Sequence, residues 1–152
     1  MHPVFSKRLV FEQLDEAIAK GGIFSHRVIL VSRVFPVFYV KFLNKHDLPR
    51  LLRFDCTNYD FQPMAVEPVD PTTKEPLARS AWMRQGNNAE FPTHKMKGNN
   101  PFFCITGVRD YYTYESHIPK ITNGRWEQHR ASHRIPDLLL YISEKFSTGK
   151  WA

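Results

Sequence analysis

The sequence predicts an α+β fold in which an N-terminal helix and a C-terminal helix pack on one four-stranded antiparallel meander sheet. Three observations predict it: a helical pattern near the start, four strand-like segments with short connections, and a second helical pattern at the end. The chain has 152 residues, of which 42% are hydrophobic. This length and composition suit a single domain over residues 1–152 with one hydrophobic core.

The first element is a helix predicted over residues 6–20. Its apolar residues recur at helical spacing: Leu9, Val10, Leu14, Ala17 and Ile18. Ser6 has a side chain that commonly caps a helix N-terminus, so we expect the helix to begin there. Gly21 and Gly22 follow the last apolar position and are expected to end it.

Four strands are predicted next, because Val, Ile, Phe and Tyr are frequent and partly alternate with polar residues. They are expected over residues 23–33, 36–43, 48–56 and 64–69. The connections between them are short, which favours antiparallel pairing of neighbours in sequence order.

The second half of the chain is less regular until its last element. Residues 70–100 are polar and predict a long loop with a short turn near residues 77–83, and loops of this length are usually functional. Residues 115–134 are expected to be irregular and are rich in His and Arg. A helix is predicted over residues 134–147, with Pro136 in its first turn.

Composition restricts the class of protein. The net charge of +6 allows an acidic partner but does not require one. Two cysteines are too few for a disulfide scaffold, and the charged N-terminus does not resemble a signal peptide. The longest apolar-rich stretches, residues 34–40 and 138–142, are far below the roughly 20 residues that span a bilayer. We therefore expect a cytoplasmic protein with no membrane partner.

Cys104 is the main candidate for chemistry, because it follows the long polar loop. Small, polar or basic residues surround it in sequence: Gly98, Asn99, Asn100, Gly107, Arg109 and His117. Cations, a neighbouring base or backbone amides favour the nucleophilic thiolate form of cysteine. A buried structural cysteine is the alternative for Cys104. Cys56 ends a predicted strand and is expected to be structural.

Two further patterns offer other functions. Cys104, His117 and His129 would provide ligands for a zinc-type metal site, and His129 and His133 would share one face of a helix. No pair of these residues has a recognised zinc spacing, so we expect no metal and no cofactor.

The second pattern is a group of cations and aromatic residues of the kind that binds nucleic acid. It consists of Arg125, Arg130, Arg134, Trp126 and the Tyr111–Tyr114 run. The excess charge is modest and no nucleic-acid motif is present, so we do not expect nucleic acid as a partner.

The order of these elements resembles the ubiquitin-conjugating enzyme (UBC) family, in a divergent bacterial form. Tyr59, Phe61 and Pro63 approximately match the family's Tyr-Pro-Phe-x-x-Pro-Pro stretch, with Asp60 in place of the first proline. In the family, a His-Pro-Asn motif places its His ten positions before the catalytic Cys. Here His94 stands ten positions before Cys104, but Lys95 and Met96 follow it.

The resemblance implies a UBC-like fold and an acyltransferase of the ubiquitin-conjugating type. Cys104 would accept a ubiquitin-like protein as a thioester from a ThiF-like activating enzyme and pass it to an amine. Asn99 and Asn100 would replace the family's oxyanion donor, because Met96 cannot donate a hydrogen bond. His117 is the other candidate donor, and it would also serve as the base toward the amine.

The resemblance also implies partners. The basic residues Lys7, Arg8 and Lys20 of the first helix would contact the activating enzyme, and a JAB-type peptidase is a further candidate partner. An inactive UBC-like protein that only binds a partner is the alternative function, as is a small metal-binding protein that uses Cys104 and loop histidines.

Overall fold

The computed structural model describes residues 2–20, 23–78, 81, 96–97, 100–101, 103–114 and 125–151. Four antiparallel strands form the main sheet in the order β1-β2-β3-β4, as the sequence predicts. They are β1 (Val28–Val34), β2 (Val37–Leu43), β3 (Pro49–Asp55) and β4 (Ala65–Val69). Each strand pairs with its neighbour in sequence, so the sheet is a meander.

The first strand begins later than the predicted residue 23. The backbones of Ser25 and Val28 hydrogen-bond to each other, and the Ser25 hydroxyl accepts a hydrogen bond from the Arg27 amide at 3.1 Å. These bonds form a tight turn, so regular pairing with β2 starts only at Val28.

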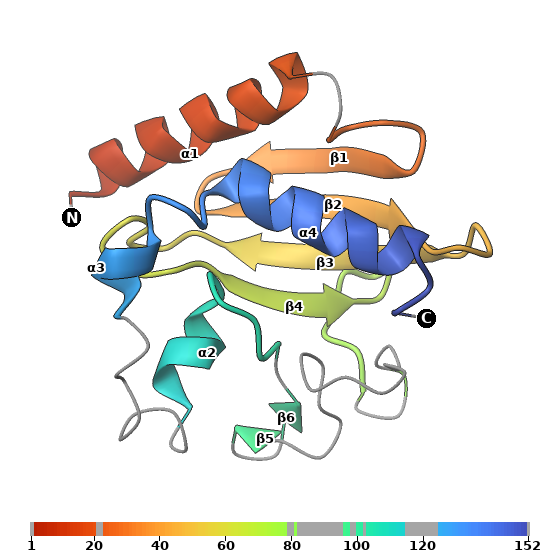
Figure 1. Cartoon of the computed structure of the whole chain (residues 1–152). Helices are drawn as coiled ribbons and strands as arrows, with labels where there is room; N and C mark the ends of the chain where they lie inside the picture. Colours follow the sequence, from red (N-terminus) through yellow and green to blue (C-terminus); the bar gives the residue numbers. More distant parts are fainter. Residues whose placement is uncertain are drawn as a thin grey trace.

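Two long helices complete the layout, α1 (Pro3–Ala19) and α4 (Ile135–Ser147). Figure 1 shows α4 lying across the central strands of the sheet, with α1 beside it. The prediction for α4 is confirmed to within one residue. Its N-terminus is capped through Asp137, whose carboxylate accepts a hydrogen bond from the Arg134 amide at 3.0 Å.

The expected cap of α1 is wrong. The helix begins at Pro3, and the His2 ring nitrogen Nδ1 accepts the Val4 amide at 3.3 Å. Ser6 lies inside the helix, is fully buried, and donates its hydroxyl to the Tyr59 carbonyl at 2.8 Å. The hydroxyl therefore ties α1 to the loop after β3, 53 residues further along the chain.

A single hydrophobic core lies between the helices and the sheet. Phe38 and Phe54 stack on neighbouring strands at 4.6 Å between ring centroids, and Phe42 stacks on Phe146 of α4 at 5.4 Å. The buried amide of Gln13 joins three segments, because its Oε1 accepts the Tyr59 hydroxyl and the Ile135 amide, both at 2.9 Å.

Four short elements follow β4 in the chain and precede α4: β5 (Met96–Lys97), β6 (Asn100–Pro101), α2 (Arg109–Thr113) and α3 (Trp126–His129). The pairing of β5 with β6 corrects the prediction that residues 70–100 contain no strand. Likewise, α3 corrects the prediction that residues 115–134 are irregular throughout. Most of the turn expected near residues 77–83 lies outside the described residues.

No helix in the described part of the chain is long and apolar enough to cross a membrane. The C-terminal Trp151 packs against Phe146 of α4 and against Phe103, at centroid distances of 5.3 and 5.6 Å. This contact links the end of the chain to the segment that carries Cys104.

Candidate functional site

The segment between β6 and α2 holds Cys104 at the surface of the core. Phe103 and Ile105 are both buried, whereas Cys104 between them is partly exposed. The segment is then fixed to the sheet side of the molecule, since the Arg109 amide donates to the Met64 carbonyl at 2.8 Å. Apolar neighbours on both sides thus anchor the backbone and leave the Cys104 side chain outside the core.

The two cysteines have different environments, and neither forms a disulfide. Cys56 is fully buried, in agreement with the structural role expected of it. Burial raises the pKa of the Cys56 thiol far above its ordinary value, and the nearby Asp55 carboxylate raises it further. Cys56 therefore remains a protonated thiol and is unsuited to nucleophilic chemistry.

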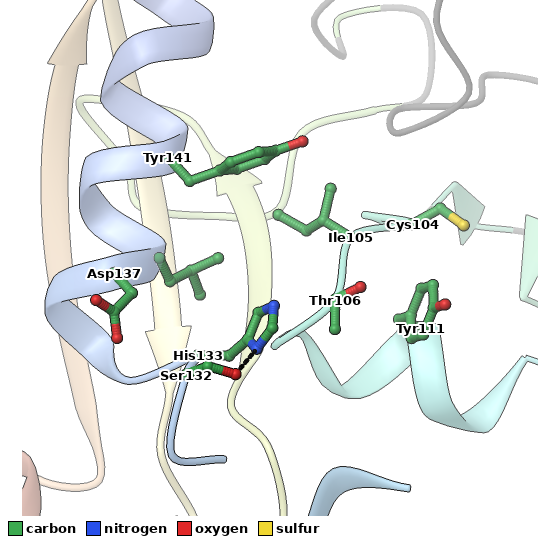
Figure 2. Close-up of a pocket in the computed structure, with 9 residues that line it drawn as sticks. Cys104, Ile105, Thr106, Tyr111, Ser132, His133, Asp137 and Tyr141 are labelled. Carbon is green, nitrogen blue, oxygen red and sulfur yellow. Dashed lines mark hydrogen bonds between the residues drawn. The ribbon is translucent and has the colours of Figure 1, made fainter. Parts of the chain in front are cut away.

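Cys104 lines a pocket of about 380 Å³ (Figure 2). One wall comes from the Cys104 segment and α2, and the opposite wall comes from the connection before α4 and from α4 itself. The lining residues are Cys104, Ile105, Thr106, Tyr111, Ser132, His133, Asp137, Leu138 and Tyr141. The pocket combines a thiol, an imidazole, hydroxyl groups and an apolar surface, a mixture typical of ligand-binding pockets.

His133 is a pocket residue that the sequence analysis did not propose for catalysis. Its ring packs on Gly107, where an added Cβ would lie 3.2 Å from the Cβ of His133. Gly107 also has a φ of +98°, a backbone conformation that favours glycine. The glycine therefore permits the two walls to approach each other closely. The presence of a glycine three residues after Cys104 was the available sequence signal for such a contact.

Tyr112 and His129 form a hydrogen-bonded pair beside the pocket. The Tyr112 hydroxyl accepts the Gly107 amide at 3.2 Å and lies 3.0 Å from Nδ1 of His129. Burial raises the pKa of Tyr112 to about 12, although the bond from Gly107 opposes this. The Tyr112 hydroxyl and Nδ1 of His129 are thus joined by a hydrogen bond, which engages one of the two ring nitrogens that could bind a metal.

The structure describes only some of the other residues predicted for catalysis or metal binding. His94, Asn99 and His117 lie outside the described residues, and Asn100 is described only by its backbone in β6. Within the described part of the chain, no group of three His, Cys, Asp or Glu side chains is placed to hold a metal. His129 and His133 do lie together, with ring centroids 5.5 Å apart.

The expectation that Arg109 supports the Cys104 thiolate is not met. Its guanidinium donates to the Pro63 and Thr57 carbonyls, each at 3.0 Å. Because these acceptors belong to the loop between β3 and β4, Arg109 holds α2 against that loop.

The group of cations and aromatic residues that resembles a nucleic-acid surface lacks its central stacking platform. Trp126 is buried, and its indole N–H donates to the Asp60 carbonyl at 2.8 Å, so its ring is not a stacking platform. Arg130 forms an ion pair with Asp60 at 3.1 Å, and Arg134 forms one with Glu16. Two of the three arginines are therefore paired within the protein.

The basic residues expected to meet a partner all lie on exposed parts of α1 or at its end. Arg8 forms an ion pair with Glu12 at 2.6 Å, and Lys20 forms one with Glu16. Lys20 is the C-cap, so at 1.5 Å per residue it lies roughly 18–20 Å along the axis from Lys7 and Arg8. The three residues do not form one patch.

Comparison with known proteins gives little further information. The sequence matches no known family profile. It is similar to an uncharacterized protein, y4jH, of Sinorhizobium fredii, with 27% identity across 68% of this chain. The match covers 62% of the length of that relative.

Proposed function

We propose that this protein carries an acyl group as a thioester on Cys104 and transfers it to an amine, as ubiquitin-conjugating enzymes do. The observation that carries the proposal is the position of Cys104, partly exposed on the rim of a pocket of about 380 Å³. The resemblance of the sequence motifs to that family supports it, and the helix, meander and helix arrangement is compatible with it.

The chemistry consists of two acyl transfers. In the first, the Cys104 thiolate attacks the carbonyl carbon of an incoming thioester, a new C–S bond forms, and the donor thiolate leaves with the electron pair. In the second, an amine nitrogen attacks the carbonyl carbon on Cys104. The C–N bond forms, the C–S bond breaks, the Cys104 thiolate leaves, and the nitrogen loses a proton.

Each transfer passes through an oxyanion that requires hydrogen-bond donors. Thr106 and Tyr111 line the same pocket as Cys104 and carry hydroxyl groups of a suitable kind. Asn99 and Asn100 remain candidates from the sequence, since they immediately precede this segment. The two hydroxyl donors differ in kind from the asparagine of the family's His-Pro-Asn motif, whereas Asn99 and Asn100 would supply the same amide group.

The partners of the proposed function follow from the same resemblance. The acyl group would be the C-terminus of a ubiquitin-like protein, and its donor a ThiF-like activating enzyme. The exposed end of α1, with Lys7 and Arg8, is the surface proposed for the activating enzyme. A JAB-type peptidase would act on the conjugates.

A thioester-transfer assay tests the proposal. The protein is mixed with a candidate activating enzyme, a ubiquitin-like protein and ATP, and analysed on reducing and non-reducing gels. The expected result is a reducible adduct that persists in Cys56→Ala and disappears in Cys104→Ala. An adduct that persists in Cys104→Ala would contradict the assignment of Cys104.

A binding-only protein of the same fold is a second candidate. Phe5 on α1 and Phe61 in the loop before β4 are both 63% exposed, which is unusual for phenylalanine and offers apolar contact surface. Met96 in place of the family's asparagine also favours a loss of catalysis. In that case Cys104→Ala would leave partner binding and function in the cell unchanged.

A further inference from the structure

We infer that His133 is the base that takes the proton from the amine attacking the Cys104 thioester. This inference rests on the proposed function and adds a residue to it. His133 and Cys104 line opposite walls of the same pocket, one on the connection before α4 and the other on the segment before α2 (Figure 2).

The hydrogen bonds of the His133 ring determine which nitrogen is basic. Nδ1 lies 3.2 Å from the His129 carbonyl and 3.1 Å from the Ser132 hydroxyl. That hydroxyl itself donates to the His129 carbonyl at 3.1 Å. Both neighbours of Nδ1 are therefore acceptors, so Nδ1 carries the hydrogen in the neutral ring, and Nε2 holds the lone pair.

The lone pair of Nε2 faces the pocket. In Figure 2 the Nδ1 side of the ring is joined to Ser132, and the second nitrogen points away from it, toward the Thr106 side. The ring is held in this orientation from both sides, by the turn from His129 to His133 and by its packing on Gly107. A fixed imidazole with one nitrogen bound to a carbonyl has the arrangement required of a general base.

The direction of the Cys104 side chain decides which proton His133 removes. In Figure 2 the sulfur points away from His133. His133 is therefore not placed to deprotonate the thiol itself. Cys104 and His133 both line the pocket of about 380 Å³, and this volume would admit an alkylamine whose nitrogen attacks the thioester.

The step balances without a further reactant. The amine nitrogen forms a bond to the acyl carbon, the bond from that carbon to Sγ of Cys104 breaks, and Sγ leaves with the electron pair. The proton of the nitrogen moves to Nε2 of His133, which gives an imidazolium with Nδ1–H still donated to the His129 carbonyl. Solvent then removes the proton and restores the base.

The test uses small reagents, so it does not depend on a partner enzyme. Cys104 of the Cys56→Ala protein is loaded from the acetyl thioester of mercaptoethanesulfonate, and the adduct is located by peptide mass spectrometry. n-Butylamine is then added, and the loss of the acetyl group and the formation of N-butylacetamide are followed. The same measurement is made with His133→Ala, with and without added imidazole.

The matched control is His46→Ala, because His46 is an exposed histidine in the turn between β2 and β3. We expect His133→Ala to load acetyl at the same rate as its parent but to lose it to butylamine about 100-fold more slowly. Added imidazole is expected to restore part of the rate, an effect that a purely structural role of His133 would not give. His46→Ala is expected to match its parent in both steps.

Three results would overturn the inference. Equal discharge rates in His133→Ala and its parent, after normal loading, would contradict the role of His133 and leave the proposed function intact. A slower rate that imidazole does not restore would assign His133 a structural role. Failure of Cys104 to accept acetyl in the folded protein would overturn both proposals.

Discussion

The two cysteines lie in two differently built regions of the molecule. Cys56 directly follows β3 and lies inside the core, where burial holds its thiol protonated. Cys104 stands on a segment anchored by Phe103 and Ile105, with its side chain at a pocket. Cys56 stands between the polar residues Asp55 and Thr57 and is nevertheless buried, whereas Cys104 stands between two apolar residues and is partly exposed, so the direction of the side chain decides the environment. Chemistry is therefore expected at one of them.

The largest expected effect concerns the region around Cys56. Phe54→Ala removes a fully buried ring that stacks on Phe38, and such truncations lower the free energy of unfolding by about 3–5 kcal/mol. Phe61→Ala, at a largely exposed site, is the matched control and is expected to change it by about 0.5 kcal/mol or less. Urea denaturation measures both. Equal losses of unfolding free energy in the two variants would contradict the placement of Phe54 in the core and of Phe61 at the surface.

The next effect compares the two thiols directly. In the folded protein, a maleimide is expected to label Cys104 at least about 100-fold faster than Cys56, since Cys56 reacts only when the core opens. Peptide mapping after timed quenching measures the two rates. In denaturant the rates should become similar. Comparable rates without denaturant would mean that Cys56 is as accessible as Cys104.

A third prediction concerns the glycine that brings the pocket walls together. Gly107→Ala places a Cβ at 3.2 Å from His133 in a backbone conformation with φ of +98°, so we expect a loss of about 1–3 kcal/mol in unfolding free energy. Thermal or urea denaturation measures it. The same substitution should slow acetyl discharge from Cys104, because it displaces His133. Unchanged stability and unchanged discharge would show that the walls do not meet at this glycine.

The smallest effect is a pH dependence at the contact between α1 and α4. Hydrogen bonds from Arg134 and then Lys20 lower the pKa of Glu16 from 4.5 to about 2. Since this pKa is lower in the folded state, the stabilisation is present above pH 4.5 and is lost as the pH falls toward 2. Glu16→Gln should therefore flatten this acid-induced loss slightly, as measured by urea midpoints across that range. An identical pH profile for the wild type and Glu16→Gln would show that Glu16 does not contribute to the acid-induced loss of stability.

The sheet and α4 were predictable from sequence because their apolar residues follow strand and helix periods. The cap of α1 was not, since the partner of Ser6 is the Tyr59 carbonyl, far away in sequence. The local sequence pattern favours a capping role, in which the serine hydroxyl accepts a hydrogen bond from a backbone amide. In the folded protein the Ser6 hydroxyl instead donates to a distant carbonyl. Trp126 was misjudged for the same reason, because its buried contact with Asp60 depends on how the chain folds back.

The candidate site was predictable only in part. Cys104 could be selected from its apolar flanks, its neighbouring glycines and the position of His94. His133 could not, because the sequence does not show which loop faces the cysteine across the pocket. The four-residue spacing from His129 to His133 indicated that the two rings lie together, as they do. It did not indicate that His133 would share a pocket with Cys104.

The central claim is that Cys104, and not Cys56, carries an acyl group. Its most direct test is to incubate the folded wild-type protein with the acetyl thioester and to map the acetyl group by mass spectrometry before and after hydroxylamine treatment. We predict a hydroxylamine-sensitive acetyl group on Cys104 and none on Cys56. Acetylation of Cys56 with Cys104 unmodified would contradict the account.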